Sequence, residues 1–241
     1  MKVLLFFLLV LWSVPVMPEA APCDARSAVL KAMERLSPNN ARLWLDMESA
    51  DGRGRVQMRS MELEAEQEAG FRRLQIELTA PEALKGVRIT ARSENGDLPV
   101  AEVFMPATGR VQKMRIEQGS ISLMGSELPV GTWFQEASTS LVYIDEGRTE
   151  WEGVKVRRIR VVHGSDLGWA YFYLREADGS LLYLERYNKE DKPTATAAFE
   201  AYPLANDAEE RLWPAQIRLK NLSSGEQTLL VIRKGLWPIK S

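Results

Sequence analysis

The chain has 241 residues, 45% of them hydrophobic, and its 31 Lys and Arg against 33 Asp and Glu give a formal net charge of −2. This length is ample for a sizeable hydrophobic core, and the balanced charge argues against the broad basic surface of a nucleic-acid-binding protein. One Cys and one His exclude an internal disulfide and a zinc site made of cysteines alone. They also leave little room for histidine-based metal or triad chemistry.

The first 20 residues have the pattern of a secretory signal. Lys2 precedes an uncharged stretch over residues 3–18 that is rich in Leu and Phe. The stretch is shorter than the roughly 20 apolar residues that a membrane-spanning helix needs. Small residues follow at Ala20 and Ala21, as a cleavage site requires. We expect a cleaved signal over residues 1–20, with an uncleaved N-terminal anchor as the alternative.

Cys23 lies where a bacterial lipoprotein carries its lipid-attachment cysteine. That processing favours Leu or a similar residue three positions earlier and Gly or Ala directly before the cysteine. This chain has Ala20 and Pro22 at those positions. The sequence therefore favours a free thiol near the mature N-terminus, and a lipidated Cys23 is the alternative.

Residues 24–36 predict a helix. Ala25, Val29, Ala32 and other apolar residues recur there at spacings of three and four, which places them on one helix face. Asp24 suits the N-cap, and Ser37-Pro38 ends the helix.

The chain beyond Arg42 alternates between apolar and polar residues, the pattern of half-buried strands. The stretch LWLDME at 43–48 is the first example, and the glutamates of MELEAEQE at 61–68 predict a solvated sheet face. Turns are expected at Asn95-Gly96 and Glu146-Gly147, among other sites. Further strands are expected near 74–78, 87–93, 98–105, 110–117, 139–145, 154–163, 169–175, 181–188, 194–202, 214–221 and 226–233.

More than ten strands with mostly short connections predict a mainly β fold with a large antiparallel sheet. One face of most strands is apolar, so we expect the sheet to curve around that face. The N-terminal helix and a lid segment over 119–140, which contains Trp133 and Phe134, would cover the opening. No change in composition and no linker divides the chain, and we expect a single domain over residues 21–241.

Catalytic and metal-binding patterns are weak. His163 precedes Gly164-Ser165-Asp166, but adjacency in sequence does not create a triad, and no G-x-S-x-G motif is present. No H-E-x-x-H or calcium-loop spacing occurs. We expect no enzymatic activity, no cofactor and no metal, and no dependence of function on His163. A hydrolase using Ser165 and His163 is the alternative.

The most basic strand contains Lys155, Arg157, Arg158 and Arg160. Two interpretations are open. The cations could hold an anionic head group or a partner, or they could pair with an acidic neighbouring strand, which the sequence favours.

One region resembles a known family. Pro81-Glu82 and Leu84-Lys85-Gly86 precede a strand, and VAEVFMPATGRVQKMRIEQGSISLMGSELPV follows at 100–130. The order P-x-x-x-K-G, two strands, GRVQKMR and S-x-x-M-G-S-E resembles the LolA-like outer-membrane lipoprotein-sorting proteins, which are periplasmic carriers related to LolA, LolB and the RseB sensor domain. Two positions depart from the family. Leu123 replaces a frequent aromatic residue, and residues 128–131 replace an aromatic-acidic stretch.

The resemblance implies a half-open β-barrel in the periplasm, whose concave apolar face shields acyl chains of a lipid or lipoprotein from water. We expect a monomer that carries such cargo. The alternative is a sensor or adaptor domain that carries nothing and docks on an envelope transporter of the RND type. The residues expected to bind lipid share the apolar phase of their strands: Leu43, Leu45, Met47, Leu74, Ile76, Leu78, Ile89, Phe104, Met114 and Ile116.

Overall fold

The computed structural model describes residues 24–37, 40–94, 100–115, 141–163, 168–202 and 213–236. The expected signal at 1–20, Cys23 and the expected lid at 119–140 lie outside these residues.

One α-helix and thirteen strands make up the described part of the chain. Helix α1 spans Ala25–Leu36, and Asp24 occupies the N-cap as expected, although it makes no side-chain capping bond. The strands are β1 (Ala41–Ala50), β2 (Val56–Glu68), β3 (Phe71–Ala80), β4 (Arg88–Glu94), β5 (Val100–Met105), β6 (Arg110–Arg115), β7 (Leu141–Trp151), β8 (Val154–His163), β9 (Trp169–Arg175), β10 (Leu181–Tyr187), β11 (Pro193–Glu200), β12 (Gln216–Asn221) and β13 (Gln227–Leu236), with a 3-10 turn, η1 (Glu82–Leu84), after β3.

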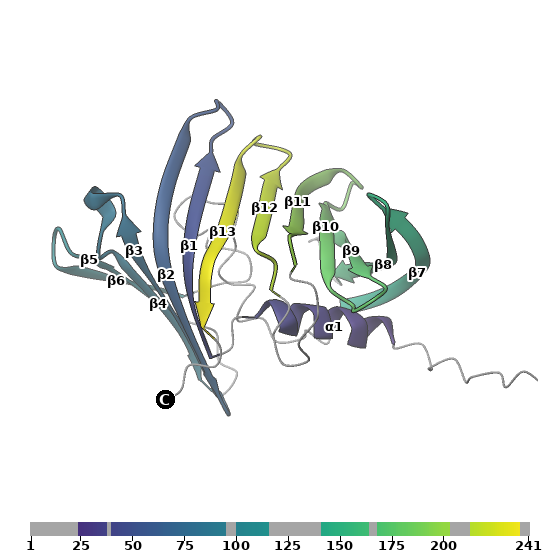
Figure 1. Cartoon of the computed structure of the whole chain (residues 1–241), viewed down its shortest axis with the longest axis horizontal. Helices are drawn as coiled ribbons and strands as arrows, with labels where there is room; N and C mark the ends of the chain where they lie inside the picture. Colours follow the sequence, from purple (N-terminus) through teal and green to yellow (C-terminus); the bar gives the residue numbers. More distant parts are fainter. Residues whose placement is uncertain are drawn as a thin grey trace, which may run out of the picture.

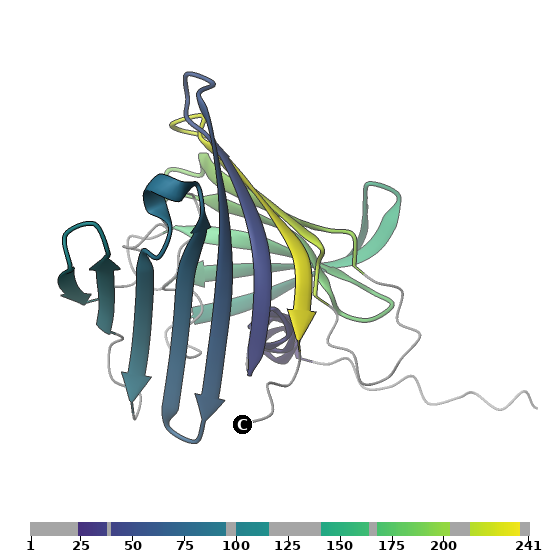
Figure 2. The same ribbon diagram turned by 60° about the vertical axis from the view of Figure 1, so that its left-hand side comes forward.

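All thirteen strands belong to one antiparallel sheet with the order β6-β5-β4-β3-β2-β1-β13-β12-β11-β10-β9-β8-β7. Strands that are consecutive in the chain pair with each other, except β6 and β7. The pairing of β1 with β13 joins the first and last strands of the described chain. Figures 1 and 2 show that the sheet bends strongly, with β6 and β7 at its two ends. The expected mainly β fold with a large curved sheet is confirmed.

The turn expected at Glu146-Gly147 is wrong. β7 continues through both residues to Trp151, because a register shift between Asp145 and Arg148 accommodates them as a bulge. A bulge inserts an extra residue without ending the pairing of two strands. The hairpin instead turns after Trp151, where β7 passes to β8.

Strand alternation gives the sheet one apolar and one polar face. Along β1, Leu43, Leu45 and Met47 are buried, whereas Arg42 and Glu48 are exposed. The glutamates of β2 lie on the polar face, where Arg42 pairs with Glu62. The solvated acidic face expected for this strand is therefore confirmed.

Helix α1 covers one end of the apolar face. Its Val29 and Ala32 are buried in one cluster with Ile159, Phe172 and Leu181 of β8, β9 and β10. Figure 2 shows α1 on the inner side of the bend. The apolar face is therefore the concave one, and we call it the inner face.

Candidate functional site

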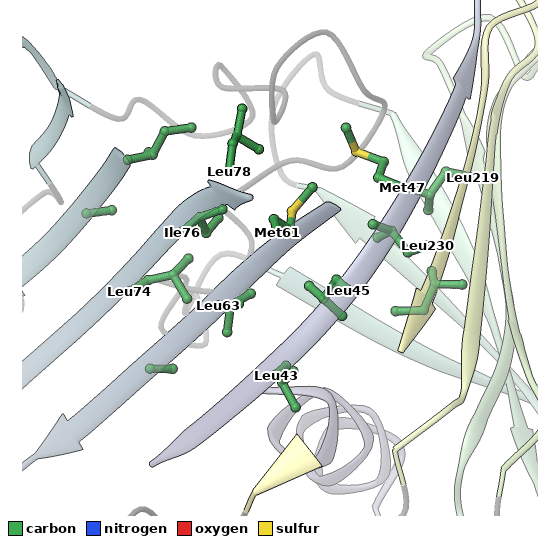
Figure 3. Close-up of a cluster of buried hydrophobic side chains, with 14 of the residues drawn as sticks. Leu43, Leu45, Met47, Met61, Leu63, Leu74, Ile76, Leu78, Leu219 and Leu230 are labelled. Atoms are coloured by element: carbon green, nitrogen blue, oxygen red, sulfur yellow. The ribbon is translucent and has the colours of Figure 1, made fainter. Parts of the chain in front are cut away.

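The candidate site is the part of the inner face formed by β1–β5 and β11–β13. Its buried side chains form one cluster, separate from the cluster under α1. Figure 3 shows side chains of β1, β2 and β3 projecting from the same side of their strands. The largest members of the cluster are Leu43, Leu45, Met47, Met61, Leu63, Leu74, Ile76, Leu78, Ile89, Trp213, Ile217, Leu219 and Leu230.

Strand register aligns these side chains in rows across the sheet. Leu43 pairs with Leu63, Leu63 with Ile76, Ile76 with Ile89, and Ile89 with Val103. Directly paired residues of antiparallel strands project on the same face, with their Cβ atoms about 5 Å apart. One continuous aliphatic row therefore crosses five strands.

Seven of the ten residues expected to bind lipid lie together in this cluster, each exposed by 6% or less: Leu43, Leu45, Met47, Leu74, Ile76, Leu78 and Ile89. Their shared face agrees with the alternation from which they were chosen. Their role in binding lipid stays a prediction.

The predicted position of Phe104 on the inner face is wrong. Val103 pairs with Ile89, whereas Phe104 pairs with Arg88, so Phe104 projects from the outer face. The error arises because β5 has apolar residues in both phases, and only the register with β4 separates them. Met114 pairs with Ala101 through its backbone, and Ile116 lies outside the described residues.

Sequence reasoning omitted several members of the cluster. Met61 and Leu63 of β2 are each exposed by only 1%, and Leu219 and Leu230 come from the C-terminal strands. The sequence did indicate the inner-face position of Met61 and Leu63, because both alternate with the glutamates of the same strand. No local pattern in the sequence indicated that β13 pairs with β1 and so brings β12 and β13 beside the N-terminal strands.

The inner face is closed in this structure. Side chains as large as Leu43, Met47 and Ile76 have almost no contact with solvent, so other parts of the chain cover them. Leu84 and Val87, near η1, are among the residues packed against the cluster. A ligand on this face would have to replace contacts that the chain makes with itself.

The outer face of β7–β10 carries a second feature, a row of aromatic rings. Trp169 stacks on Tyr187 with ring centroids 3.9 Å apart, and Tyr171 contacts both rings edge-on at 4.8 and 6.0 Å. The row continues through Tyr173 and Tyr183 to Trp151. Such ring pairs contribute stability beyond their buried area.

The basic strand β8 lies beside this row. Arg158 and Arg160 each pair with Glu146 of β7, at 2.8 and 3.3 Å, and Arg157 pairs with Asp145 at 2.7 Å. The expected pairing with acidic residues of a neighbouring strand is confirmed. The Arg157 guanidinium also lowers the pKa of Asp145.

Burial raises the pKa of tyrosines in the same region. Burial, followed by the neighbouring Glu185 carboxylate, raises the pKa of Tyr187 to about 12. Burial also raises the pKa values of Tyr173 and Tyr183. The phenols therefore stay neutral hydrogen-bonding groups at physiological pH.

The described residues provide no metal site. No group of three His, Cys, Asp or Glu side chains among them could hold a metal ion. The backbone of His163 pairs with Leu141 at the end of β8, while Ser165 and Asp166 lie outside the described residues. Within the same residues, no helix has the length and apolar character needed to cross a membrane.

Solved structures share this fold. A candidate outer membrane lipoprotein-sorting protein domain from Vibrio parahaemolyticus superposes with a TM-score of 0.73 at 16% identity, over 88% of this chain and 91% of that one. A DUF1329 family protein from Desulfovibrio piger gives 0.74 at 16% identity, over 90% and 93%. A LolA superfamily protein from Nitrosomonas europaea gives 0.65 at 14% identity, over 88% and 92%.

No family model matches the sequence, and no curated protein matches it significantly. The structural matches extend over most of each chain, so this chain shares its fold with these proteins. The resemblance noticed at residues 81–130 is confirmed at the level of the fold.

Proposed function

We propose that this protein is a periplasmic carrier that shelters acyl chains of a lipid or lipoprotein on the inner face. The observation that carries the proposal is the continuous aliphatic surface across β1–β5 and β11–β13. The fold shared with a lipoprotein-sorting domain supports it, as does the sequence pattern of a secretory signal at residues 1–20. The proposed form is a monomeric single domain over residues 21–241.

Sequestration needs apolar area rather than reactive groups. Each methylene that leaves water contributes about 0.8 kcal/mol, so an acyl chain can offset the loss of contacts that now cover the inner face. The residues that cover the inner face must move aside for loading. A ligand would favour this open state to the extent that it binds the open state more tightly than the closed one. No bond is broken in this mechanism, which is why we propose a non-enzymatic role.

A second candidate function is a sensor or adaptor domain that docks on an envelope transporter of the RND type. The aromatic row on the outer face favours docking, because Tyr, Trp and Arg are enriched at the energetic centres of protein interfaces. Here Trp169, Tyr171 and Tyr187 lie beside Arg158 and Arg160, whose guanidinium groups lie 4.8 Å from the Tyr171 ring and 5.9 Å from the Trp169 ring, respectively.

The test of the carrier is a bulky substitution on the inner face. Ile76→Trp fills space that an acyl chain would occupy, so we expect an acyl probe to bind about tenfold more weakly or worse. Because the contacts that cover Ile76 must yield for loading, we expect them to accommodate the ring with little change in melting temperature. Glu64→Trp places the same ring on the outer face of β2 and should leave probe binding unchanged. Probe fluorescence and thermal denaturation measure the two effects.

A permanently packed core predicts the opposite result. Ile76→Trp would then overpack the core and destabilise it by about 1–3 kcal/mol, and the wild type would show no saturable probe binding. That outcome would contradict the carrier and leave the docking domain. Native mass spectrometry of the purified protein, which would detect lipid retained from the cell, gives an independent test.

A further inference from the structure

The inner face changes from apolar to polar toward the β1–β2 hairpin. Along β1 the buried Met47 is followed in the same phase by Ser49, and along β2 the buried Met61 is preceded by Arg59 and Gln57. Met47 pairs with Arg59, and Ser49 pairs with Gln57. These three polar residues therefore extend the inner face beyond its aliphatic part.

Two neutral partners hold the Arg59 side chain. Its Nη1 donates to Ser49 Oγ at 3.1 Å, and its Nη2 donates to Gln57 Oε1 at 2.5 Å. The Nε atom is buried and has no acceptor within the described part of the chain. A buried donor without an acceptor costs about 1–3 kcal/mol, so the guanidinium is oriented but incompletely satisfied.

No carboxylate of the described residues pairs with Arg59, unlike arginines on the outer face. On the outer face of the same strands, Arg42 pairs with Glu62 and Arg73 pairs with Glu66. Over the described strands β1–β5, inner-face positions hold no Asp or Glu, as the register and burial pattern show. Arg72, near the β2–β3 hairpin, is a second inner-face arginine but lies at the other end of the face.

We infer that Arg59 binds the anionic group of an acyl ligand, a carboxylate or a phosphate, while the acyl chain lies along the adjacent Leu and Met side chains. The inference rests on the proposed carrier function and names its ligand class. An amphiphile with one charged end matches a face that is apolar over most of its length and carries the oriented Arg59 guanidinium at the β1–β2 end. Guanidinium binds carboxylate and phosphate through paired, charge-assisted hydrogen bonds, and the unpartnered Nε–H is available for one of them.

The experiment compares a pyrene-labelled long-chain fatty acid with its methyl ester, which has the same acyl chain but an uncharged end. The wild type should bind the acid about tenfold more tightly than the ester, as expected for a charge-assisted hydrogen bond. Arg59→Gln should reduce this ratio to about one, and Arg59→Lys should keep part of it. Raising the salt concentration should lower the wild-type ratio, because salt screens the charge.

Arg72→Gln is the matched control, since it removes the same charge from the other end of the inner face and should preserve the wild-type ratio. Thermal denaturation verifies that each variant is folded. A ratio unchanged in Arg59→Gln, or lost in Arg72→Gln, would overturn the assignment of Arg59. Wild-type protein that binds neither probe would instead contradict the proposed carrier function.

Inorganic phosphate separates a lipid head group from a free anion. Because the acyl chain supplies most of the affinity, millimolar phosphate should displace neither probe. Displacement of the acid by phosphate at that concentration would show a site for small anions and would overturn the assignment to an acyl ligand.

Discussion

Side chains at successive positions of β1 and β2 alternate between the buried inner face and the solvent-facing outer face. Leu63 is buried against Leu43 and Ile76, whereas Glu62 and Glu64 on either side of it project outward. Backbone pleating produces this alternation, because successive Cβ atoms of a strand point to opposite faces. The same rule fails at Phe104, where both phases are apolar and the partner strand decides the face.

Gly168 offers a test of local packing at β9. A Cβ atom at this residue would lie 2.1 Å from the carbonyl oxygen of Tyr187, and its φ of +81° is left-handed. At Gly153, φ is +79° but nothing lies within 4 Å of an added Cβ. We expect Gly153→Ala to cost about 1–2 kcal/mol from backbone strain alone, and Gly168→Ala roughly 3 kcal/mol or more.

Urea denaturation of both glycine variants measures the two free energies of unfolding. The difference between them isolates the contact with β10, since both positions carry a similar backbone penalty. Equal losses of stability in the two variants would show that the close approach at Gly168 contributes nothing.

Strands β9 and β10 form a unit that buries tyrosines on the outer face. Trp169 stacks on Tyr187, and the indole Nε1 of Trp169 donates to Asp191 Oδ1 at 2.8 Å. Ring contacts and hydrogen bonds together fix the side chains in one arrangement, as a docking surface requires. The same burial makes the unit sensitive to alkaline pH.

Alkaline pH should destabilise the protein through Tyr187. An unfolded tyrosine ionises near pH 10, whereas the pKa of Tyr187 in the folded protein is about 12. The unfolded state therefore loses its proton first. The stability that the protonated Tyr187 hydroxyl contributes to the folded state is fully present below about pH 10, and it is lost as the pH rises toward about 12.

The measurement is the fall in melting temperature between about pH 8 and pH 11. Tyr187→Phe keeps a ring for stacking on Trp169 but removes the ionisable hydroxyl, so its melting temperature should fall less than that of the wild type. A decrease as large as that of the wild type would contradict the assignment to Tyr187.

The whole sheet depends on one pairing between distant parts of the chain. β1 pairs with β13, for example through Met47 and Leu230, and links the strands β1–β6 to the strands β7–β13. Leu184 and Phe199 also pack against both hydrophobic clusters. Neither half of the sheet is therefore isolated from the other.

We predict that the protein unfolds in one cooperative transition, as a single domain should. Far-ultraviolet circular dichroism reports the sheet throughout, and tryptophan fluorescence reports local packing, so their midpoints in urea should coincide. Two separated transitions would show that the halves fold independently and would contradict the single domain predicted over residues 21–241.

Properties that depend on local periodicity could be predicted from the amino-acid sequence. It located α1 and the thirteen strands to within a few residues at most ends, and it identified Leu43, Ile76 and Leu78 as members of one apolar face. Periodicity carries this information because backbone geometry fixes which neighbours share a face. The length of β7 was underestimated, since the bulge near Gly147 has the same local composition as a turn.

Which strands pair across the sheet could not be predicted and is known from the fold. The pairing of β1 with β13 brings Leu219 and Leu230 into the inner face, the register of β5 turns Phe104 outward, and the bend of the sheet makes the apolar face concave. The structure also shows that no carboxylate of the described residues pairs with Arg59. Each of these depends on contacts between residues far apart in the chain, which leave no local pattern because register is set by the partner strand.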